Sequence, residues 1–137
     1  MTIDIKAMLH RIVAEVFDET FMIEQTTSSK NPWMHTVRVA NPAIPERTAI
    51  ICATYEWMEV FIPELKVTGT IFEYDDVEED KGNALRPLCI AMRMYLDGEG
   101  RIEQKRRLFR RGTVPVLYLD IDGMECYLGR NCWSIPY

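Results

Sequence analysis

The apolar residues of this sequence repeat with a helical period in two segments and with a strand period in the segments between and after them. In the first helical segment, one face is formed by Ile5, Met8, Leu9, Ile12, Val13 and Val16. In the second, one face is formed by Leu85, Leu88, Cys89, Met92, Tyr95 and Leu96. The spacing predicts helices over about residues 3–17 and 84–97. Thr2 and Asn83 are the expected caps, and Pro87 is expected in the first turn of the second helix.

Short runs rich in β-branched and aromatic residues fill the rest of the chain. The runs before the second helix are TFMIEQTT, WMHTVRVA, TAIICATY, WMEVFIP and KVTGTIFEY, and those after it are RIEQKRRLF, VPVLYLDI and MECYLG. Asp122 and Gly123 predict a two-residue hairpin turn between the last two runs. The order of elements predicts an α+β fold: an antiparallel β-sheet of about six to seven strands, with an N-terminal helix and a second helix near residues 84–97.

The length of 137 residues suits a single globular domain spanning residues 1–137, because no linker or internal repeat divides the chain. The longest apolar runs, such as residues 49–53 and 114–119, are far shorter than the roughly 18 residues of a membrane span. Asp4 stands where a signal peptide carries basic residues, and no cleavage site follows. We therefore expect a cytoplasmic protein that does not associate with a membrane.

The spacing of the cysteines does not predict a metal site. The four cysteines are Cys52, Cys89, Cys126 and Cys132. They form no Cys-x2-Cys pair, and the two histidines lie far from them in sequence. In a cytoplasmic protein the thiols are expected to be reduced, and Cys52 and Cys89 fall inside apolar patterns typical of buried residues. We expect no metal ion and no cofactor.

Charge is distributed unevenly along a chain whose formal net charge is -5. Residues 1–80 carry 15 acidic and 6 basic side chains, whereas residues 81–137 carry 6 acidic and 10 basic ones. The densest acidic cluster is formed by Glu73, Asp75, Asp76, Glu78, Glu79 and Asp80. Mutual repulsion predicts an exposed loop leading into the second helix, whose N-terminal dipole favours anions. The functional alternatives are a surface that steers a basic protein partner and a divalent-cation site, although the run lacks the order of a calcium loop.

Basic residues are concentrated in GRIEQKRRLFRRGT, residues 100–113. In a strand, one face would hold Arg101, Glu103, Lys105 and Arg107, and the other Ile102, Gln104, Arg106 and Leu108. This segment is interpreted as a solvated strand that resists edge-to-edge aggregation, as a protein interface or as a nucleic-acid site. The net negative charge of the chain and a single aromatic residue in the segment, Phe109, disfavour nucleic acid as a partner.

The sequence contains no familiar catalytic motif. A nucleophile elbow, a zinc-protease motif and a phosphate-binding glycine loop are all absent from it. A thiol site remains open as a pair of Cys52 and His35 on neighbouring strands. Aromatic residues that are candidates for an exposed interface are Trp33, Tyr55, Trp57, Tyr74, Trp133 and Tyr137. We expect a protein that is not an enzyme and has no catalytic residues.

The second predicted helix ends in Leu-x-Gly and is followed by a basic strand, an Arg-Arg-Gly turn and a hairpin with a glycine at its tip. The residues that form this pattern are Leu96, Gly98, Arg101, Arg110, Arg111, Gly112 and Gly123. Over about a third of the chain, the pattern resembles the C-terminal part of small bacterial immunity proteins from polymorphic toxin systems. The resemblance implies a cytosolic antidote that binds and blocks a cognate toxin.

The layout is also similar to that of secretion chaperones, although those end in a third helix and this chain ends in SIPY. Together, the patterns predict a non-enzymatic protein-binding module, most specifically an immunity protein whose residues 73–80 contact a basic toxin surface. The alternatives are a secretion-type chaperone for an effector and a nucleic-acid binder that uses residues 101–111. A small thiol enzyme is the last alternative.

Overall fold

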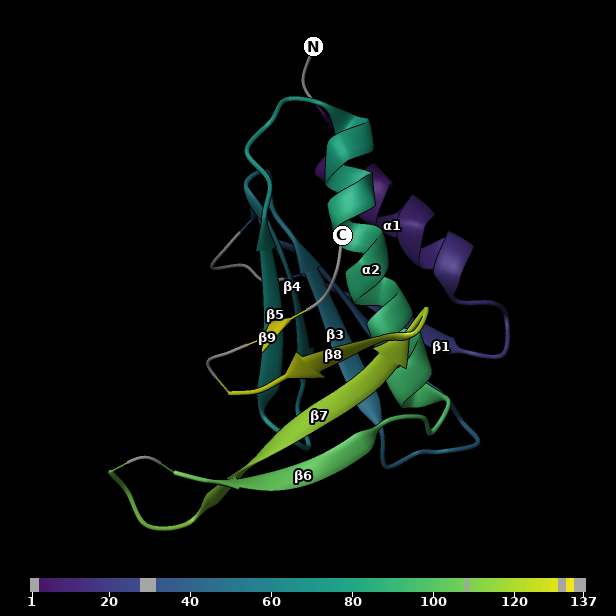
Figure 1. Cartoon of the computed structure of the whole chain (residues 1–137). Coiled ribbons are helices and arrows are strands. Elements are labelled where there is room, and N and C mark those ends of the chain that lie inside the picture. Colours follow the sequence, from purple (N-terminus) through teal and green to yellow (C-terminus); the bar gives the residue numbers. More distant parts are fainter. Residues whose placement is uncertain (1–2, 28–31, 108, 131–132, 135–137) are drawn as a thin grey trace.

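The computed structural model describes residues 3–27, 32–107, 109–130 and 133–134. The helices are α1 (Ile5–Val16) and α2 (Glu78–Leu96). The strands between them are β1 (Met22–Thr27), β2 (His35–Ala40), β3 (Thr48–Ala53), β4 (Trp57–Ile62) and β5 (Val67–Phe72). The strands after α2 are β6 (Arg101–Arg106), β7 (Thr113–Ile121), β8 (Met124–Leu128) and β9 (Trp133–Ser134). The predicted α+β class, with its N-terminal helix and its second helix, is confirmed (Figure 1).

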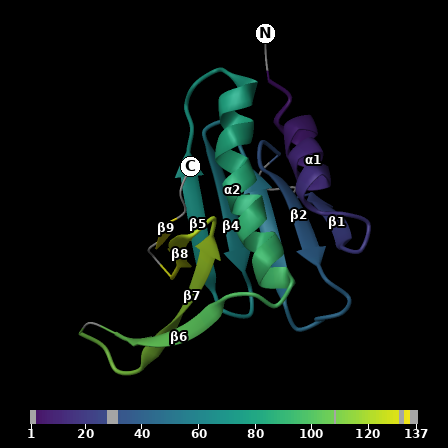
Figure 2. The same cartoon turned by 45° about the vertical axis from the view of Figure 1, so that its right-hand side comes forward.

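Strands β1 to β5 form an antiparallel meander in which each strand pairs with the next along the chain. Both helices lie against the same face of this sheet, as two views of the molecule show (Figures 1 and 2). The alternation along β4 follows from this arrangement. Met58 and Val60 are buried on the helix side, whereas Trp57 and Phe61 lie on the outer face and are partly exposed.

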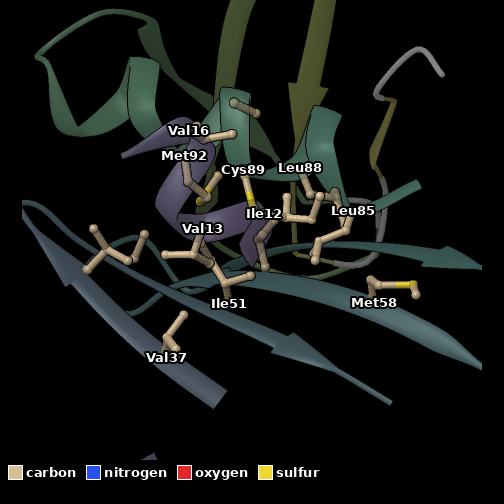
Figure 3. Packing of buried hydrophobic residues seen from close by; sticks show 14 of the residues in the cluster. Ile12, Val13, Val16, Val37, Ile51, Met58, Leu85, Leu88, Cys89 and Met92 are labelled. Atoms are coloured by element: carbon tan, nitrogen blue, oxygen red, sulfur yellow. The ribbon is translucent and has the colours of Figure 1, made fainter. Parts of the chain in front are cut away.

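The core lies between the two helices and the inner face of the first sheet. Ile12 and Val13 of α1 and Leu88 of α2 pack toward Val37 and Ile51 of the sheet (Figure 3). All five side chains are almost completely removed from solvent. Burying an aliphatic side chain of this size contributes about 1.5–3 kcal/mol, so the helical period of the sequence determines which helix faces turn toward the sheet.

Both helices begin at residues other than the predicted ones. Helix α1 is capped by Asp4, whose carboxylate accepts a hydrogen bond from the Ala7 N–H at 3.0 Å. The predicted cap, Thr2, lies outside the described residues. Helix α2 begins at Glu78, so the predicted cap Asn83 lies inside it. The first turn of α2 carries three acidic side chains, which the helix dipole stabilises at this end.

Pro87 lies in the interior of α2 rather than in its first turn. A proline there has no N–H to donate to the carbonyl one turn earlier, which disfavours the helix. Leu85 and Leu88, on either side of Pro87, are completely buried against the rest of the core. Tertiary packing therefore maintains the helix across a residue that, in sequence, indicates a helix start.

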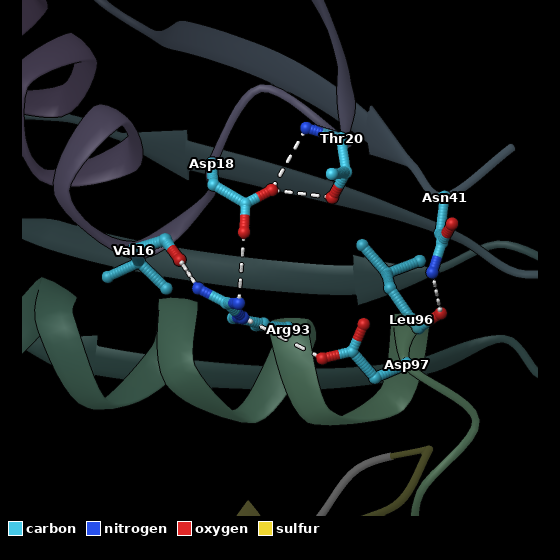
Figure 4. Close-up of polar contacts among 7 residues, drawn as sticks. All are labelled: Val16, Asp18, Thr20, Asn41, Arg93, Leu96 and Asp97. Carbon is cyan, nitrogen blue, oxygen red and sulfur yellow. Dashed lines mark hydrogen bonds and ion pairs between the residues drawn. The ribbon is translucent and has the colours of Figure 1, made fainter.

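Arg93 of α2 joins the second helix to the end of the first. Its guanidinium donates to the Val16 carbonyl at 2.5 Å and to the Asp18 carboxylate at 3.3 Å, and it pairs with Asp97 at 3.7 Å (Figure 4). The carbonyls of the last helical turn have no partner within their own helix. Arg93 therefore supplies a donor to the C-terminal end of α1 and fixes the packing of the two helices.

Strands β6 to β9 form a second antiparallel sheet, and its β6–β7 hairpin extends away from the body (Figures 1 and 2). Leu117 and Leu128 are buried on the side that faces the body. The Thr68 N–H of β5 donates to the Gly129 carbonyl at 3.0 Å, which joins the two sheets. The predicted hairpin turn is confirmed, since Asp122 and Gly123 have φ values of 52° and 81°.

The described residues form nine strands in two sheets, where about six to seven strands were predicted in one. The division arises because α2 carries the chain from the end of β5 to the far end of the body, where β6 begins a separate hairpin (Figure 1). Neither helix in the described part of the chain is long and apolar enough to cross a lipid bilayer.

Candidate functional site

The six acidic residues singled out from the sequence gather at the end of the molecule where α2 begins. Glu73, Asp75 and Asp76 lie in the connection from β5, and Glu78, Glu79 and Asp80 form the first turn of α2. In Figure 1 this connection is the loop above the N-terminal end of α2. The expected acidic loop is therefore partly a loop and partly a helical turn.

Several of these carboxylates have partners within the protein. Asp76 accepts a hydrogen bond from the Tyr55 hydroxyl at 2.6 Å, and this bond raises the pKa of Tyr55. Glu78 pairs with Arg11 of α1 at 3.4 Å. The Glu73 carboxylate accepts the Asp75 N–H at 3.0 Å. These contacts connect the acidic segment to Tyr55 and to α1.

The buried side chain of Lys81 forms hydrogen bonds with the backbone of the acidic segment and of the neighbouring loop. Its side chain is completely buried, and its ammonium donates to the carbonyls of Tyr55 and Glu73. The ammonium nitrogen lies 4.4 Å from the centre of the Tyr55 ring, where a cation is attracted to the ring face. A lysine within a charged helix start gives no signal of burial in the sequence, so this anchor could not be predicted.

Exposed apolar side chains lie among the carboxylates. Phe72, Tyr74 and Val77 are 55%, 64% and 48% exposed. The rings of Phe72 and Tyr74 are stacked, with centroids 6.1 Å apart and an interplanar angle of 17°. We call residues 72–80 the acidic–aromatic end. Tyr74 was a candidate interface aromatic from the sequence. Phe72 was missed because only the fold shows which face of β5 the helices leave uncovered, and Val77 was missed because it lies in the connection just before α2.

A cleft of about 530 Å³ adjoins the acidic–aromatic end. Its lining includes three of the aromatic residues predicted to form an interface, Trp33, Tyr55 and Trp57. Trp33 is 60% exposed, and the Glu73 N–H donates to the Glu56 carbonyl of the cleft at 2.8 Å. The cleft and the acidic–aromatic end therefore form one continuous surface. Tyr137, another predicted aromatic, lies outside the described residues.

Strand β6 of the basic segment is an edge strand of the second sheet, and its Arg101, Glu103 and Lys105 lie on the outer face of that sheet. Strand pairing places Arg101, Glu103 and Lys105 beside Tyr118, Val116 and Val114 of β7. The predicted alternation is followed only over Arg101–Arg106, where every residue except Glu103 is exposed; Arg107 lies beyond the end of the strand, and Leu108 lies outside the described residues. A groove of about 870 Å³ runs over this face. We call it the basic groove; its polar and aromatic lining consists of Lys105, Arg106, Arg107, Arg110, Tyr118, Glu125, Tyr127 and Arg130.

The cations of the second sheet fall into two groups. Arg101 pairs with Glu103 at 3.4 Å and with Glu125 at 3.7 Å, and Lys105 pairs with Glu103 at 3.5 Å. The other group forms no ion pair within the described ranges and consists of Arg106, Arg107, Arg110, Arg111 and Arg130. The positive charge near the tip of the β6–β7 hairpin is therefore not neutralised by these carboxylates.

The described cysteines do not have the properties of nucleophiles. Cys52, Cys89 and Cys126 are buried, and burial raises the pKa of each thiol because it disfavours the thiolate. Cys52 pairs in register with Thr36, whose hydroxyl donates to its Sγ at 3.5 Å. His35 directly precedes Thr36 in β2, so its side chain points to the opposite face of the sheet. The structure does not bring Cys52 and His35 together, and Cys132 lies outside the described residues.

Over residues 3–27, 32–107, 109–130 and 133–134, no three His, Cys, Asp or Glu side chains are arranged to hold a metal ion. The acidic–aromatic end and the basic groove remain as the two surfaces with distinctive chemistry.

Comparison of the chain with protein-family models, with curated proteins and with solved structures gives no significant match.

Proposed function

We propose that the protein is a non-enzymatic protein-binding module whose acidic–aromatic end contacts a basic surface of a partner protein. The observation that carries this proposal is the pair of exposed, stacked rings of Phe72 and Tyr74 among six carboxylates. In protein interfaces, a few large aromatic side chains supply most of the binding energy, and the surrounding charged residues exclude water and select the partner.

The arrangement of the surface supports an interface more than a solvated face. Exposed aromatic rings are disfavoured in water, and partner binding would remove them from it. The adjoining cleft, with Trp33 and Trp57 in its lining, offers a recess for a side chain of the partner. The internal contacts of Lys81 and Asp76 hold the backbone in place before binding, so that little conformational entropy is lost on association.

The most specific form of the proposal is an immunity protein that binds and blocks a cognate toxin. The resemblance of the helix, basic strand and hairpin to immunity proteins supports this role. The acidic charge at residues 73–80 supports a toxin with a basic surface, because charge complementarity accelerates encounter and disfavours wrong partners. The protein would act by occupying the toxin surface rather than by transforming a substrate.

The test is affinity capture of the partner from the native host with matched variants. Asp75 and Glu79 form no side-chain hydrogen bond or ion pair in the described part of the chain, so D75N with E79Q changes charge without breaking an internal contact. The control pair E99Q and D120N makes the same change at exposed residues elsewhere. We expect the first pair, and separately F72A with Y74A, to weaken capture by more than tenfold.

The control pair should capture one stoichiometric protein as the wild type does. Once that protein is known, its expression in susceptible cells should stop growth, and coexpression of the wild-type chain should restore it. Equal capture by every variant would refute the acidic–aromatic end as the interface. Capture without any effect on growth would refute the immunity role while leaving the interface in place.

A further inference from the structure

We propose that the basic groove is a binding site for single-stranded nucleic acid. This inference is independent of the acidic–aromatic end, because the groove lies on the second sheet and shares no residue with it. In Figure 1 the β6–β7 hairpin that carries the groove and the start of α2 lie at opposite ends of the molecule. Contact at one surface therefore does not require contact at the other.

The charge of the groove matches a phosphate backbone. Arg106, Arg107, Arg110 and Arg130 all line it and have no carboxylate partner within the described ranges. Guanidinium groups form two parallel hydrogen bonds with phosphate oxygens. The one acidic side chain among the described lining residues, Glu125, is paired with Arg101 at 3.7 Å. The four arginines therefore give the groove a positive charge that no described carboxylate neutralises.

The groove contains aromatic rings on which bases can stack, whereas the basic segment itself contains a single aromatic residue, Phe109. Tyr118 of β7 and Tyr127 of β8 are directly paired across the strands, with ring centroids 6.3 Å apart. The Arg101 guanidinium and the Lys105 ammonium lie 4.6 Å and 5.5 Å from the centre of the Tyr118 ring, so cations and rings lie side by side on this face. Bases stack on aromatic rings and on guanidinium planes, and several RNA-binding modules present such rings on the outer face of an antiparallel sheet.

The combination favours a single strand over the other anionic partners. A duplex hides the faces of its bases inside the stack, so the two rings would have no base to contact. An acidic protein would also pair with the guanidinium groups, but a nucleotide places a flat base beside every phosphate, which matches rings that lie next to arginines. A groove of about 870 Å³ that is open to solvent suits an extended strand whose bases turn toward the sheet.

The test is the fluorescence anisotropy of labelled oligonucleotides of about 12 nucleotides, single-stranded RNA and DNA and the matching duplex, titrated with the full chain at about 50 mM salt and above. We expect saturable binding of the single strands, weaker binding of the duplex, and affinity that falls steeply with salt. R107Q with R110Q should lower the dependence of log affinity on log salt by about 1.4, because two phosphate contacts are lost.

Two further variants separate the two parts of the site. Y127A should weaken single-strand binding by about tenfold without changing the salt dependence, because it removes a stacking ring and no charge. K6Q with R38Q removes two exposed cations outside the groove and should leave binding unchanged. Thermal unfolding of each variant confirms that it is folded. Absence of saturable binding at low salt, or equal losses in the control pair, would overturn the proposal.

Polyglutamate serves as the competitor that represents an acidic protein. If it displaces the oligonucleotide only at much higher charge concentration than unlabelled single strand, the site is selective for nucleic acid. Displacement at equal charge concentration would assign the groove to an acidic protein partner and overturn the inference. Neither result bears on the affinity-capture experiment, in which F72A with Y74A is expected to weaken capture of the partner protein.

Discussion

Lys81 carries a positive charge into the core directly beneath the acidic–aromatic end. Its ammonium is satisfied by the carbonyls of Tyr55 and Glu73 and by the face of the Tyr55 ring. A buried charge is costly unless it is fully hydrogen-bonded, so the two carbonyls are held where the ammonium needs them. The loop that presents Tyr74 and Asp76 is therefore positioned by a residue that does not reach the surface.

Replacement of Lys81 by methionine tests this role. Methionine keeps most of the volume but leaves the carbonyls of Tyr55 and Glu73 without their donor, which costs about 1–3 kcal/mol per buried group. We expect K81M to lower the free energy of unfolding by about 2 kcal/mol or more, measured by urea denaturation. K66M, at an exposed lysine, serves as the control and should unfold at the wild-type urea concentration. An unchanged midpoint for K81M would contradict the anchoring role.

The buried thiol of Cys89 makes stability depend on alkaline pH. Burial raises its pKa from 9.0 to about 12. Well below pH 9.0 the thiol is protonated in both the folded and the unfolded chain, so stability does not depend on its ionisation there. As pH rises toward 12, the unfolded chain loses the proton that the folded chain keeps, and stability falls by at most about 1.4 kcal/mol per pH unit.

We expect the free energy of unfolding in urea to fall between about pH 8 and about pH 10.5. In C89A, which lacks the thiol, the fall should be smaller. The remaining decrease belongs to groups such as Tyr95, whose pKa is also raised, chiefly by burial. A stability that rises over this pH range, or an equal slope in both proteins, would show that Cys89 ionises as readily when folded as when unfolded.

At the scale of elements, periodicity predicts the faces of the helices and strands but not their ends. The apolar spacing of α1 agrees with its buried face, whereas β6 is exposed along almost all of its length. The start of α2 was predicted too late, because Pro87 indicates a first turn and the acidic run indicates a loop. The helix dipole and the buried Lys81 stabilise the additional turns, and neither effect is visible in apolar spacing.

Some residues of the two candidate surfaces could be predicted from the sequence, whereas others are brought there only by the fold. The acidic residues of the acidic–aromatic end lie close together in the sequence, so they could be predicted as one cluster from the sequence alone. The exposure of Phe72 depends on which face of β5 the helices cover, which is a property of the assembled sheet. Tyr118 and Tyr127 reach the basic groove through the pairing of β7 with β8, so the linear basic segment does not contain them.

The interior position of Pro87 leads to a stability prediction at this scale. P87A restores a backbone donor within α2 and removes a residue that is about 3 kcal/mol unfavourable in a helix interior. The gain is reduced by up to about 1 kcal/mol because alanine leaves the unfolded chain more flexible. We expect a net stabilisation of about 1–2 kcal/mol in urea denaturation.

P45A provides the matched control, since Pro45 lies exposed in the connection between β2 and β3. It should be neutral or slightly destabilising, because only the unfolded chain is affected. If α2 instead began near residue 84, Pro87 would occupy a first turn, where proline is tolerated. In that case P87A would behave like P45A, and the longer helix would be contradicted.

The whole molecule carries its charge in two separate places, a negative cluster where α2 begins and a positive cluster on the β6–β7 hairpin. The first sheet and the two helices, joined by the hydrophobic core, lie between them (Figure 1). Such a separation orients an approaching charged partner before contact. We propose that the protein acts by presenting the acidic–aromatic end to another protein.

The most direct measurement of this claim is hydrogen exchange of the chain alone and in complex with the captured partner. We predict that the complex slows exchange at residues 72–80 and at the loop carrying Tyr55, while backbone amides lining the basic groove exchange as before. The slowing should be absent when F72A with Y74A replaces the wild type at the same concentrations. A partner footprint that spares residues 72–80 and falls on other elements would contradict the account.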